Sequence, residues 1–525
     1  MKIPKVPFTI LSLAPFRPTP DTSSPEMISV AMETLDNGVA ACRPQLWISQ
    51  PADICPAGGV TVSPTRMKDV TPDGLIRITP YLKDLHDAGE FIERSIASGA
   101  TAEETARQLK TAWPLLPLDL SLPVRESRAR PRATVDDILF MVAVPGQPAP
   151  TAAAEMAGPK KWKNQVNDML ARLLKNIFDS DVFRRFEAAW RGVEVVIRQG
   201  IVRTGGPIRL LIVPADRKNL PEVLEGLASK LIPDPPNLIL IDIPLDNTPE
   251  SLTLMEKITL FADMLLAPTA IWITPGFFRL HSWHDLGKLP YLRNHLDDAA
   301  HAKWRKLQER AESRWLVVTC NRFLTRQLYG EDLQPRTVRF REREPLWISP
   351  VWALGALVSQ SIVNYHLPSR LTDYVNIRLE DLAVISFENG TVASTEVVIP
   401  DDRIRQLQEA GFMPLTGAMN SDAAFMSRET TASGESLLCQ LFLSHIIGFL
   451  IQCRRQLPGG GENSETDIRE TLNAFFRDVD CEPPADMTLF VGRAEPGEPV
   501  TFRIAFTPSR IALPISRRLE FTFLW

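Results

Sequence analysis

Four short apolar runs, separated by stretches of helical spacing, constrain the fold of this chain more than any other feature. Nearly continuous apolar strands are typical of parallel sheets that are covered on both faces, and their alternation with helices is typical of α/β proteins. We therefore predict an α/β fold with a mostly parallel sheet between flanking helices. The four runs are Ile208 to Val213, Leu238 to Ile241, Ala270 to Ile273 and Leu316 to Val318.

The segment before the first run has the spacing of amphipathic helices. Apolar residues recur at steps of three or four over residues 162–177 and again over 183–193, which places them on one helix face. We expect the second helix to end at the triplet Trp190, Arg191 and Gly192, where a further apolar run begins. In this interpretation the tryptophan packs, the glycine permits a close approach, and the arginine bonds loop carbonyls or a neighbouring carboxylate.

The end of the chain changes to period-two patterning, in which apolar residues alternate with others as on a β-strand. Two such runs joined by a loop with proline and serine predict an antiparallel pair at residues 500–525. Because unpaired backbone groups at a sheet edge accept further strands, this pair is a candidate contact with another chain. The apolar residues of the two runs are Phe502, Ile504 and Phe506, and Leu519, Phe521, Phe523 and Trp525.

A proline-rich stretch divides the chain into two units. Prolines cluster between residues 114 and 150 and a run of small residues follows, a composition that suits a connector rather than a packed element. We place a small α/β unit at residues 1–125, a Pro/Ala-rich connector with a short helix at 126–159, and a larger unit at 160–525. Within the first unit we expect a strand at Phe8 to Leu13 and helices at Glu26 to Ala41 and Thr79 to Ala97.

Composition favours a cytoplasmic protein. The 525 residues carry a net charge of -5 with both signs interspersed, which gives no electrostatic reason to expect nucleic acid or an anionic membrane as partner. Six cysteines without a CxxC pair are poor material for a zinc site or a disulfide framework. Pro7 and Pro15 bracket the short N-terminal apolar run, so we expect no secretion signal. The most apolar helical window, Leu437 to Ile451, is shorter than a membrane span and is interpreted as a core helix.

Segments along the second unit resemble the large sheath subunit of type VI secretion systems, the TssC (VipB) family. The sequence FRRFEAAWRGVEVVI carries the Trp-Arg-Gly triplet, and residues 304–330 are similar to the family's tryptophan helix, core strand, Arg-Phe-Leu turn and Tyr-Gly end. A tryptophan after an acidic stretch, a Thr-Glu strand, a Gly-Phe-x-Pro-Leu segment and a late helix with histidine follow in family order. The residues of this signature are Trp190, Arg191, Gly192, Trp304, Arg322, Tyr329, Gly330, Trp347, Thr395, Glu396, Gly411, Phe412, Pro414 and His445.

The first unit resembles the small sheath subunit, the TssB (VipA) family, in three shorter segments. These are Pro7 to Phe16, Glu33 to Leu46 and Met67 to Ile76. Small and large sheath subunits are obligate partners, so the two resemblances together imply a fusion of both in one chain. Covalent linkage makes their association intramolecular, at high effective concentration.

The resemblance implies a structural protomer of a cytoplasmic contractile sheath, which surrounds an inner tube and ejects it by contraction. Its implied partners are further copies of itself in a helical polymer, an Hcp-like inner-tube protein, baseplate components and an unfoldase of the ClpV type. Residues 133–144 resemble the helix that such an unfoldase grips. No cofactor is implied, and the chain has no GxxxxGK[ST] phosphate loop. Energy would instead be stored in a bistable assembly.

Two alternatives remain open. Family small subunits carry an N-terminal arm that links protomers, whereas only six residues precede Pro7. A sheath-fold adaptor, cap or initiator that does not polymerise is therefore the second hypothesis. A metal-dependent enzyme that uses His281, His284, His295 and His301 is the third, although their spacing matches no zinc pattern. Neither GxSxG nor HExxH is present, so we expect no catalytic or metal-binding residues.

Overall fold

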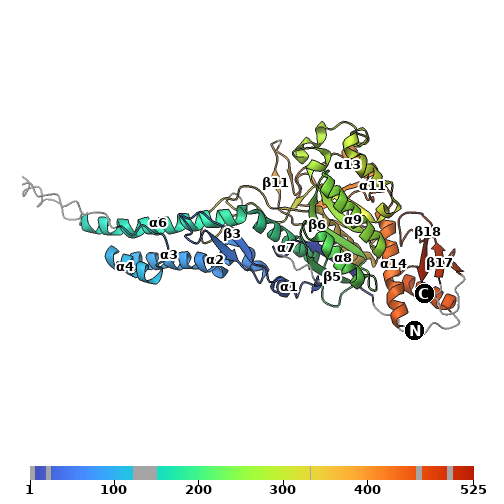
Figure 1. Cartoon of the computed structure of the whole chain (residues 1–525), viewed down its shortest axis with the longest axis horizontal. Coiled ribbons are helices and arrows are strands. Elements are labelled where there is room, and N and C mark those ends of the chain that lie inside the picture. The colour runs from blue at the N-terminus through green and yellow to red at the C-terminus, as the bar shows by residue number, and fades with distance from the viewer. Residues whose placement is uncertain are drawn as a thin grey trace, which may run out of the picture.

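The computed structural model describes residues 6–18, 25–121, 150–330, 333–388, 390–456, 464–492 and 501–524. At its centre lies a seven-stranded sheet in the order β13-β8-β7-β6-β1-β5-β2 (Figure 1). Every neighbouring pair is parallel except β2 with β5, which is antiparallel. The strands are β1 (Phe8–Ala14), β2 (Ile28–Val30), β5 (Ile208–Pro214), β6 (Leu238–Leu245), β7 (Thr269–Ile273), β8 (Leu316–Cys320) and β13 (Phe412–Pro414).

Helices cover both faces of this sheet because successive strand residues point to opposite sides. In β6, Leu240 belongs to the buried core that includes α7 and α12, whereas Ile239 belongs to the core that includes α8 and α9. The prediction of a mostly parallel sheet between flanking helices is confirmed, and each of the four apolar runs is a strand. The helices are α7 (Asp181–Gln199), α8 (Leu220–Leu231), α9 (Pro249–Leu265) and α12 (Pro350–Tyr365).

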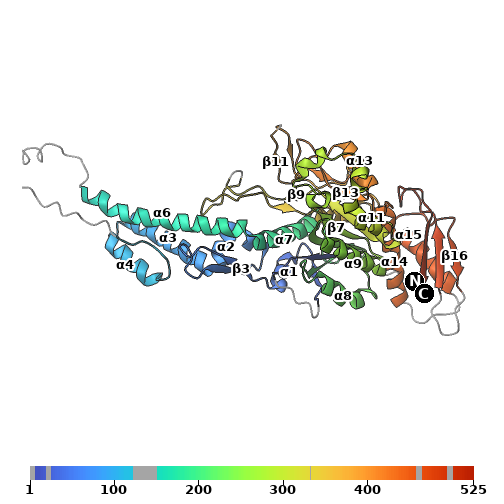
Figure 2. The same ribbon diagram turned by 45° about the horizontal axis from the view of Figure 1, so that its top comes forward.

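A long helical arm projects from this sheet body (Figures 1 and 2). In it, α3 (Pro80–Ser98) lies beside α6 (Pro150–Asp179), with α2 (Pro72–Ile78) and α4 (Ala102–Ala112) at the two ends of α3. The two long helices approach closely, since a Cβ atom at Gly89 would lie 3.2 Å from Cγ1 of Val166. The predicted helix at residues 79–97 is confirmed as α3.

The two predicted units share one core. Strand β1 lies in the middle of the sheet, between β5 and β6, with Ile10 opposite both Leu210 and Leu238. The predicted boundary at residue 160 falls inside α6, because the helix continues through Pro159 and across the small residues that suggested a connector. Most of the predicted connector, including the helix expected at residues 133–144, lies outside the described residues.

The predicted helix at residues 26–41 is wrong in its first half. Residues Ile28–Val30 form the edge strand β2 on β5, and the helix α1 (Leu35–Cys42) begins only afterwards. The alternation of Ile28, Ser29 and Val30 suits this edge position, and pairing with β5 outweighs helix propensity.

Helix α7 corrects the predicted end at the Trp-Arg-Gly triplet. It continues from Asp181 to Gln199, so the triplet lies near its middle. The apolar run after Gly192 extends the same helix, and Val193, Val196 and Ile197 are buried in the core. Packing of this face against α12 outweighs the low helix propensity of glycine and of β-branched residues.

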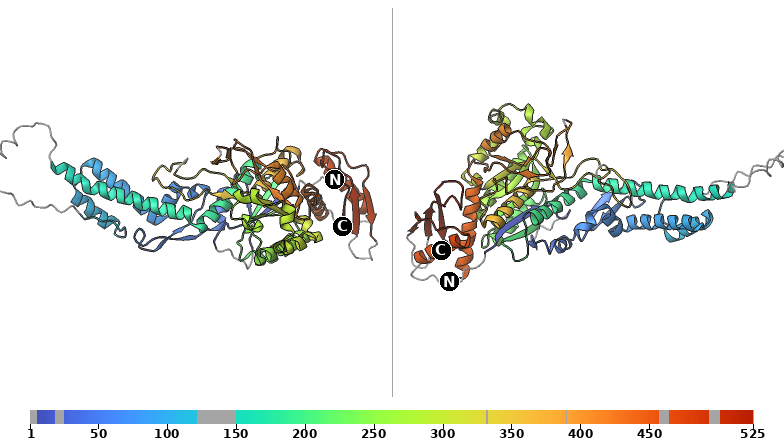
Figure 3. Two further views of the ribbon diagram at one scale, coloured as in Figure 1. Left: turned by 90° about the horizontal axis from the view of Figure 1, so that it is seen from above. Right: turned by 180° about the vertical axis from the view of Figure 1, so that it is seen from behind.

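The C-terminal strands form a small antiparallel sheet at the end of the molecule opposite the arm (Figure 3). The predicted pair is confirmed as β17 (Thr501–Phe506) and β18 (Leu519–Leu524), and β16 (Thr488–Val491) adds a third strand that the sequence did not indicate. Trp525 lies outside the described residues.

Between this sheet and the main body lie α14 (Leu437–Gln456) and α15 (Ser464–Asp478). Among the described residues, one helix is long and apolar enough to cross a membrane, namely the segment Leu437–Arg455 of α14. However, 78% of that window is buried inside the fold, as expected of a core helix.

The remaining helices and strands of the described chain are short. They are β3 (Leu46–Ser49), β4 (Gly59–Val62), η1 (Met67–Val70), η2 (Pro275–Phe278), η3 (Trp283–Lys288), α10 (Leu292–Leu296), η4 (Ala299–His301), α11 (Ala302–Gln308), η5 (Ala311–Trp315), β9 (Phe323–Leu324), β10 (Trp347–Ile348), β11 (Ile385–Ser386), β12 (Val392–Ala393), α13 (Asp401–Glu409), β14 (Thr416–Gly417) and β15 (Ala424–Phe425).

Candidate functional site

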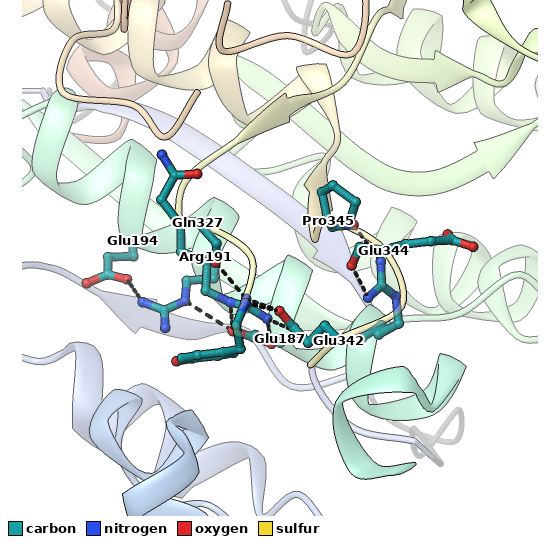
Figure 4. Close-up of polar contacts among 10 residues, drawn as sticks. Glu187, Arg191, Glu194, Gln327, Glu342, Glu344 and Pro345 are labelled. Atoms are coloured by element: carbon teal, nitrogen blue, oxygen red, sulfur yellow. Dashed lines mark hydrogen bonds and ion pairs between the residues drawn. The ribbon is translucent and has the colours of Figure 1, made fainter. Parts of the chain in front are cut away.

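A buried ionic cluster lies where the arm meets the sheet body (Figure 4). Arg326 donates two hydrogen bonds to Glu187, Nε to Oε1 at 2.8 Å and Nη2 to Oε2 at 3.0 Å. The same guanidinium donates to both carboxylate oxygens of Glu342, at 2.8 and 2.7 Å. The side chain of Arg326 is 7% exposed and those of both glutamates 0%. One cation therefore holds two carboxylates in the interior, in the bidentate geometry that suits arginine.

Aromatic rings and a further arginine enclose this cluster. The guanidinium carbon of Arg326 lies 4.5 Å from the ring centre of Tyr329 and 5.6 Å from that of Phe178, within cation–π range. Arg191 of the triplet lies 3.5 Å from Glu187 and donates to Glu194 at 3.1 Å. The arginine of the signature thus contacts a carboxylate one turn away on its own helix.

The cluster keeps its charges in the fold. Burial alone would raise the pKa of Glu187, but the charge and hydrogen bonds of Arg326 lower it below its ordinary value. Burial would likewise lower the pKa of Arg326, and the two glutamates raise it instead. Because the folded pKa of Glu187 is depressed, its stabilisation is present above the unfolded carboxyl pKa and is lost as pH falls through the folded pKa.

Residues 325–346, here called the bridging loop, connect the arm to the body. Arg184 of α7 donates to the carbonyl oxygens of Glu344 and Pro345 at 3.0 and 2.6 Å. The backbone N–H of Arg343 donates to Asp179, the last residue of α6, at 2.8 Å.

The bridging loop also reaches the arm. The hydroxyl of Thr337 donates to Asp73 of α2 at 2.6 Å. Gly330 has a φ of +99°, and a Cβ atom there would lie 2.5 Å from the carbonyl oxygen of Phe340, so this turn requires glycine. The described part of the loop therefore contacts α2, α6 and α7.

The triplet itself is a packing centre. Trp190 is fully buried with its ring 5.0 Å from that of Phe16. A Cβ atom at Gly192 would lie 2.3 Å from Cδ1 of Trp352, so the missing side chain lets α12 approach α7. Trp352 in turn donates from Nε1 to Asp242 of β6 at 2.8 Å.

A second group of signature residues lies near β9 and β10. Arg322 donates two hydrogen bonds to Glu396, at 2.8 and 3.0 Å, and its guanidinium carbon lies 5.9 Å from the ring centre of Trp347. Thr395 forms an isolated β-bridge with Phe323 rather than part of a longer strand.

A third group surrounds β13. The ring of Trp304 stacks on Phe412 with centroids 5.2 Å apart, and Gly411 has a φ of +85° just before the strand. Pro414 ends β13, where it lies opposite Cys320 of β8. Tyr329 and Gly330 belong to the bridging loop, and His445 is buried in α14 against Phe8. The signature residues therefore occupy separate places in the fold rather than one surface.

The structure does not gather the histidines into one site. His281 and His284 are exposed, whereas the buried His301 lies with its ring 5.1 Å from that of the half-buried His295. Across the described ranges, no group of three or more His, Cys, Asp or Glu side chains could hold a metal ion.

Two buried histidines give a pH-dependent stability. Burial lowers the pKa of both His301 and His445 to about 4, below the ordinary 6.5. Below pH 6.5 these histidines bind protons in the unfolded chain, whereas in the folded chain they become protonated only near pH 4. Each histidine therefore costs on the order of 1 kcal/mol of stability per pH unit in this window. Urea unfolding measures the effect. Between pH 7 and 5, the free energy of unfolding of the double variant His301→Phe, His445→Phe is expected to fall by about 2 to 4 kcal/mol less than that of the wild type.

The matched control for this prediction is His281→Phe, at an exposed position. Its loss of stability between pH 7 and 5 should equal that of the wild type. An equal pH dependence in the wild type and the double variant would contradict the prediction.

The central members of the cluster, Glu187, Arg326 and Glu342, were not predicted from the sequence. A signal for one of them was present, because Glu187 stands among Phe183, Phe186 and Trp190 on the apolar face of α7. A carboxylate in an apolar stripe requires a buried cationic partner. The sequence could not identify that partner, since Arg326 lies 139 residues away along the chain.

Comparisons with known proteins agree with the resemblance to sheath proteins. Residues 233–432 match the VipB family profile, described as EvpB/VC_A0108, tail sheath N-terminal domain. The type VI secretion system sheath protein TssC1 of Pseudomonas aeruginosa is 24% identical over 281 residues, which are 47% of this chain and 56% of that protein. The match thus spans little more than half the length of that relative.

Solved structures of sheath and baseplate proteins are also similar. The sheath tail protein of Desulfitobacterium hafniense is aligned over 59% of this chain and 60% of its own length, with a TM-score of 0.33 and 9% identity. A chain of the anti-feeding prophage baseplate is aligned over 64% and 76%, with a TM-score of 0.36 and 8% identity.

Proposed function

Because residues 233–432 match the tail sheath domain of the VipB family, we propose that this chain is a structural protomer of the contractile sheath of a type VI-like secretion apparatus. The sheath surrounds an inner tube in the cytoplasm and ejects it by contraction. The family match is the observation that carries this proposal, and the similarity to TssC1 supports it.

We further propose that residues 1–125 correspond to a small sheath subunit and take its role in the sheath. In support, β1 pairs along its whole length with β5, so the first unit and the second build one sheet. Partners that must share strands gain from covalent linkage, since the strand is then always present at high effective concentration.

The same proposal includes the partners. A helical polymer requires heterologous contacts between copies that do not close into a ring, and an inner tube of the Hcp type and baseplate components complete the apparatus. An unfoldase of the ClpV type recycles the contracted sheath. The chain acts without a cofactor, and the energy for ejection is stored in the assembled lattice.

The C-terminal sheet is the proposed contact between protomers. The side chains of Leu519, Phe521 and Phe523 are 6 to 9% exposed, so they pack within their own chain. Only the backbone edge of β18 is left for a neighbouring chain. At the opposite edge, β16 carries Phe490 and Val491 with exposures of 62% and 51%. An edge strand with exposed apolar side chains is suited to pairing with another chain.

This contact predicts an assembly defect without a folding defect. The double variant Phe490→Lys, Val491→Lys should stay folded by circular dichroism, because both side chains are exposed, and should no longer sediment as large assemblies. Charged side chains on an edge strand prevent further pairing. Analytical ultracentrifugation of the wild type and the variant measures the effect.

The control is Ile232→Lys, which places a lysine at another exposed apolar position, 54% exposed and outside the C-terminal sheet, at the end of α8. It should assemble like the wild type. Normal assembly of the β16 double variant would exclude this edge as the contact.

A further inference from the structure

A groove, here called the hairpin groove, lies on the body between η3, the β11–β12 hairpin and the segment that leads into α13. Its volume is about 920 Å³, at the upper end of the range for ligand pockets. The half-buried apolar side chains of Trp347, Ile385, Phe387 and Val398 line it. The exposed His284 packs edge-on against Phe387, with ring centres 6.1 Å apart. The groove therefore leaves apolar surface partly accessible to a partner.

The charges of the hairpin groove are mostly negative. Glu388, Glu396 and Asp402 line it, against one arginine, Arg403, which donates to backbone carbonyl oxygens at 3.0 Å. Glu396 is paired with Arg322, whereas the exposed Glu388 and Asp402 form no ion pair among the described residues. An apolar groove with two unpaired carboxylates complements a partner that combines an apolar side chain with a cation.

The loop between β17 and β18 carries this combination. Ile511 is 72% exposed, and the neighbouring Arg510 is exposed and forms no ion pair within the described ranges. Nε of Arg510 donates to the hydroxyl of Ser516 at 3.3 Å, which leaves the positive charge unbalanced. Arginine is enriched in protein interfaces. The loop thus presents an apolar side chain and a free cation at adjacent positions.

The fold holds the backbone of this loop in place. Nη2 of Arg370 donates to the carbonyl oxygens of both Arg510 and Ile511, at 3.2 and 3.1 Å. The backbone N–H of Leu513 donates to the carbonyl oxygen of Ser509 at 2.9 Å. A loop that is ordered before it binds loses less conformational entropy on association. The two exposed side chains are therefore presented on a fixed support.

The groove and the loop lie at different ends of the body. The β11–β12 hairpin is on the side from which the arm projects, whereas the C-terminal sheet is at the opposite end (Figures 1 and 2). A contact between them therefore requires two copies of the chain and joins unlike surfaces. Such heterologous contacts extend into a filament when they do not close into a ring.

We propose that the hairpin groove binds the loop at Arg510 and Ile511 of a second copy of the chain. Ile511 packs against the apolar wall of the groove, and Arg510 pairs with Glu388 and Asp402. This inference rests on the proposed function in one respect, that copies of the chain contact one another. It adds a second contact to the one proposed at β16.

Two complementary variants test the contact. Both are made in the full chain with Phe490→Lys and Val491→Lys, which remove the contact proposed at β16. The groove variant adds Glu388→Arg and Asp402→Arg, and the loop variant adds Arg510→Glu. All these positions are exposed, so circular dichroism should show both proteins folded.

Sedimentation velocity at about 0.1 mM detects a contact with a Kd of that order. Each variant alone should sediment as a monomer, because it lacks one of the two surfaces. An equimolar mixture should shift to the dimer, since each variant supplies the surface that the other lacks. The dimer cannot grow further, because its remaining groove and loop are both altered.

Matched controls reverse exposed charges outside the groove and the loop, in the same background. Arg339→Glu corresponds to the loop variant, and the pair Glu222→Arg, Glu225→Arg corresponds to the groove variant. Both controls should still form small oligomers, since the groove and the loop are intact.

A mixture that stays monomeric, or a groove or loop variant that associates when alone, would overturn the inference. Controls that stay monomeric would also overturn it. These results are separate from the test of the sheath function, because that function fails only if the unaltered chain forms neither tubes nor rings. Tubes from a chain that carries Glu388→Arg and Asp402→Arg would overturn the groove contact and leave the sheath function intact.

Discussion

The variant Arg326→Met is expected to unfold with a free energy about 3 to 5 kcal/mol below that of the wild type. The substitution leaves Glu342 without its cation and Glu187 with only Arg191, 3.5 Å away, and both glutamates are 0% exposed. Removing one partner of a buried ion pair has this effect because an uncompensated charge remains in the interior. Urea unfolding at pH 7, followed by circular dichroism, measures it.

The control for this variant is Arg310→Met. Arg310 pairs with Glu256 at 3.4 Å, but both side chains are about 40% exposed (42% and 38%), so the loss should be below about 1 kcal/mol. The triple variant Arg326→Met, Glu187→Gln, Glu342→Gln removes the stranded charges and should recover part of the stability. A loss below 1 kcal/mol for Arg326→Met would show that the cluster does not stabilise the junction of arm and body.

The second large effect is expected at Trp190. Truncation to alanine, Trp190→Ala, should lower the free energy of unfolding by about 3 to 5 kcal/mol, because it opens a cavity between α7 and the ring of Phe16 in the main core. The same urea unfolding assay applies, since the change should be visible as a lower midpoint with a similar slope.

Trp47→Ala provides the matched comparison. Trp47 is 57% exposed on the hairpin strand β3, so truncation removes a ring of equal size from a place where little area is buried. Its effect should be within about 1 kcal/mol. Equal losses in the two tryptophan variants would contradict the assignment of Trp190 as the packing centre of α7.

The strands and helices of the main body were predictable because the spacing of apolar residues along each element shows which of its faces are buried. The runs around Leu240 and Val317 are apolar on both faces, which only a covered parallel strand explains. The C-terminal pair was equally clear from its period of two. Element type was therefore predictable wherever one face, or both, is uniformly buried.

The division into units was not predictable, because it depends on long-range pairing. Nothing local to Phe8–Ala14 indicates that this strand lies between β5 and β6, about 200 residues later in the chain. The predicted end of the helix at the Trp-Arg-Gly triplet was wrong for a related reason. Gly192 resembles a helix end in the sequence, whereas its role is to admit the ring of Trp352 from another helix.

The ionic cluster shows the same limit. The sequence places Glu187 on an apolar face, but Arg326 and Glu342 belong to a loop with no periodicity of its own. Only the folded backbone brings these three side chains together. The family signature identified Tyr329 and Gly330 in that loop, and the structure adds that Tyr329 covers the guanidinium of Arg326.

Electron microscopy of the purified chain in negative stain, alone and mixed with an inner-tube protein of the Hcp type, tests the central claim most directly. A sheath protomer predicts tubes or stacked rings of regular helical symmetry in at least one of these samples. Single particles of monomer size in both, from a chain that circular dichroism shows to be folded, would contradict the sheath function and favour a sheath-fold adaptor or cap that does not polymerise.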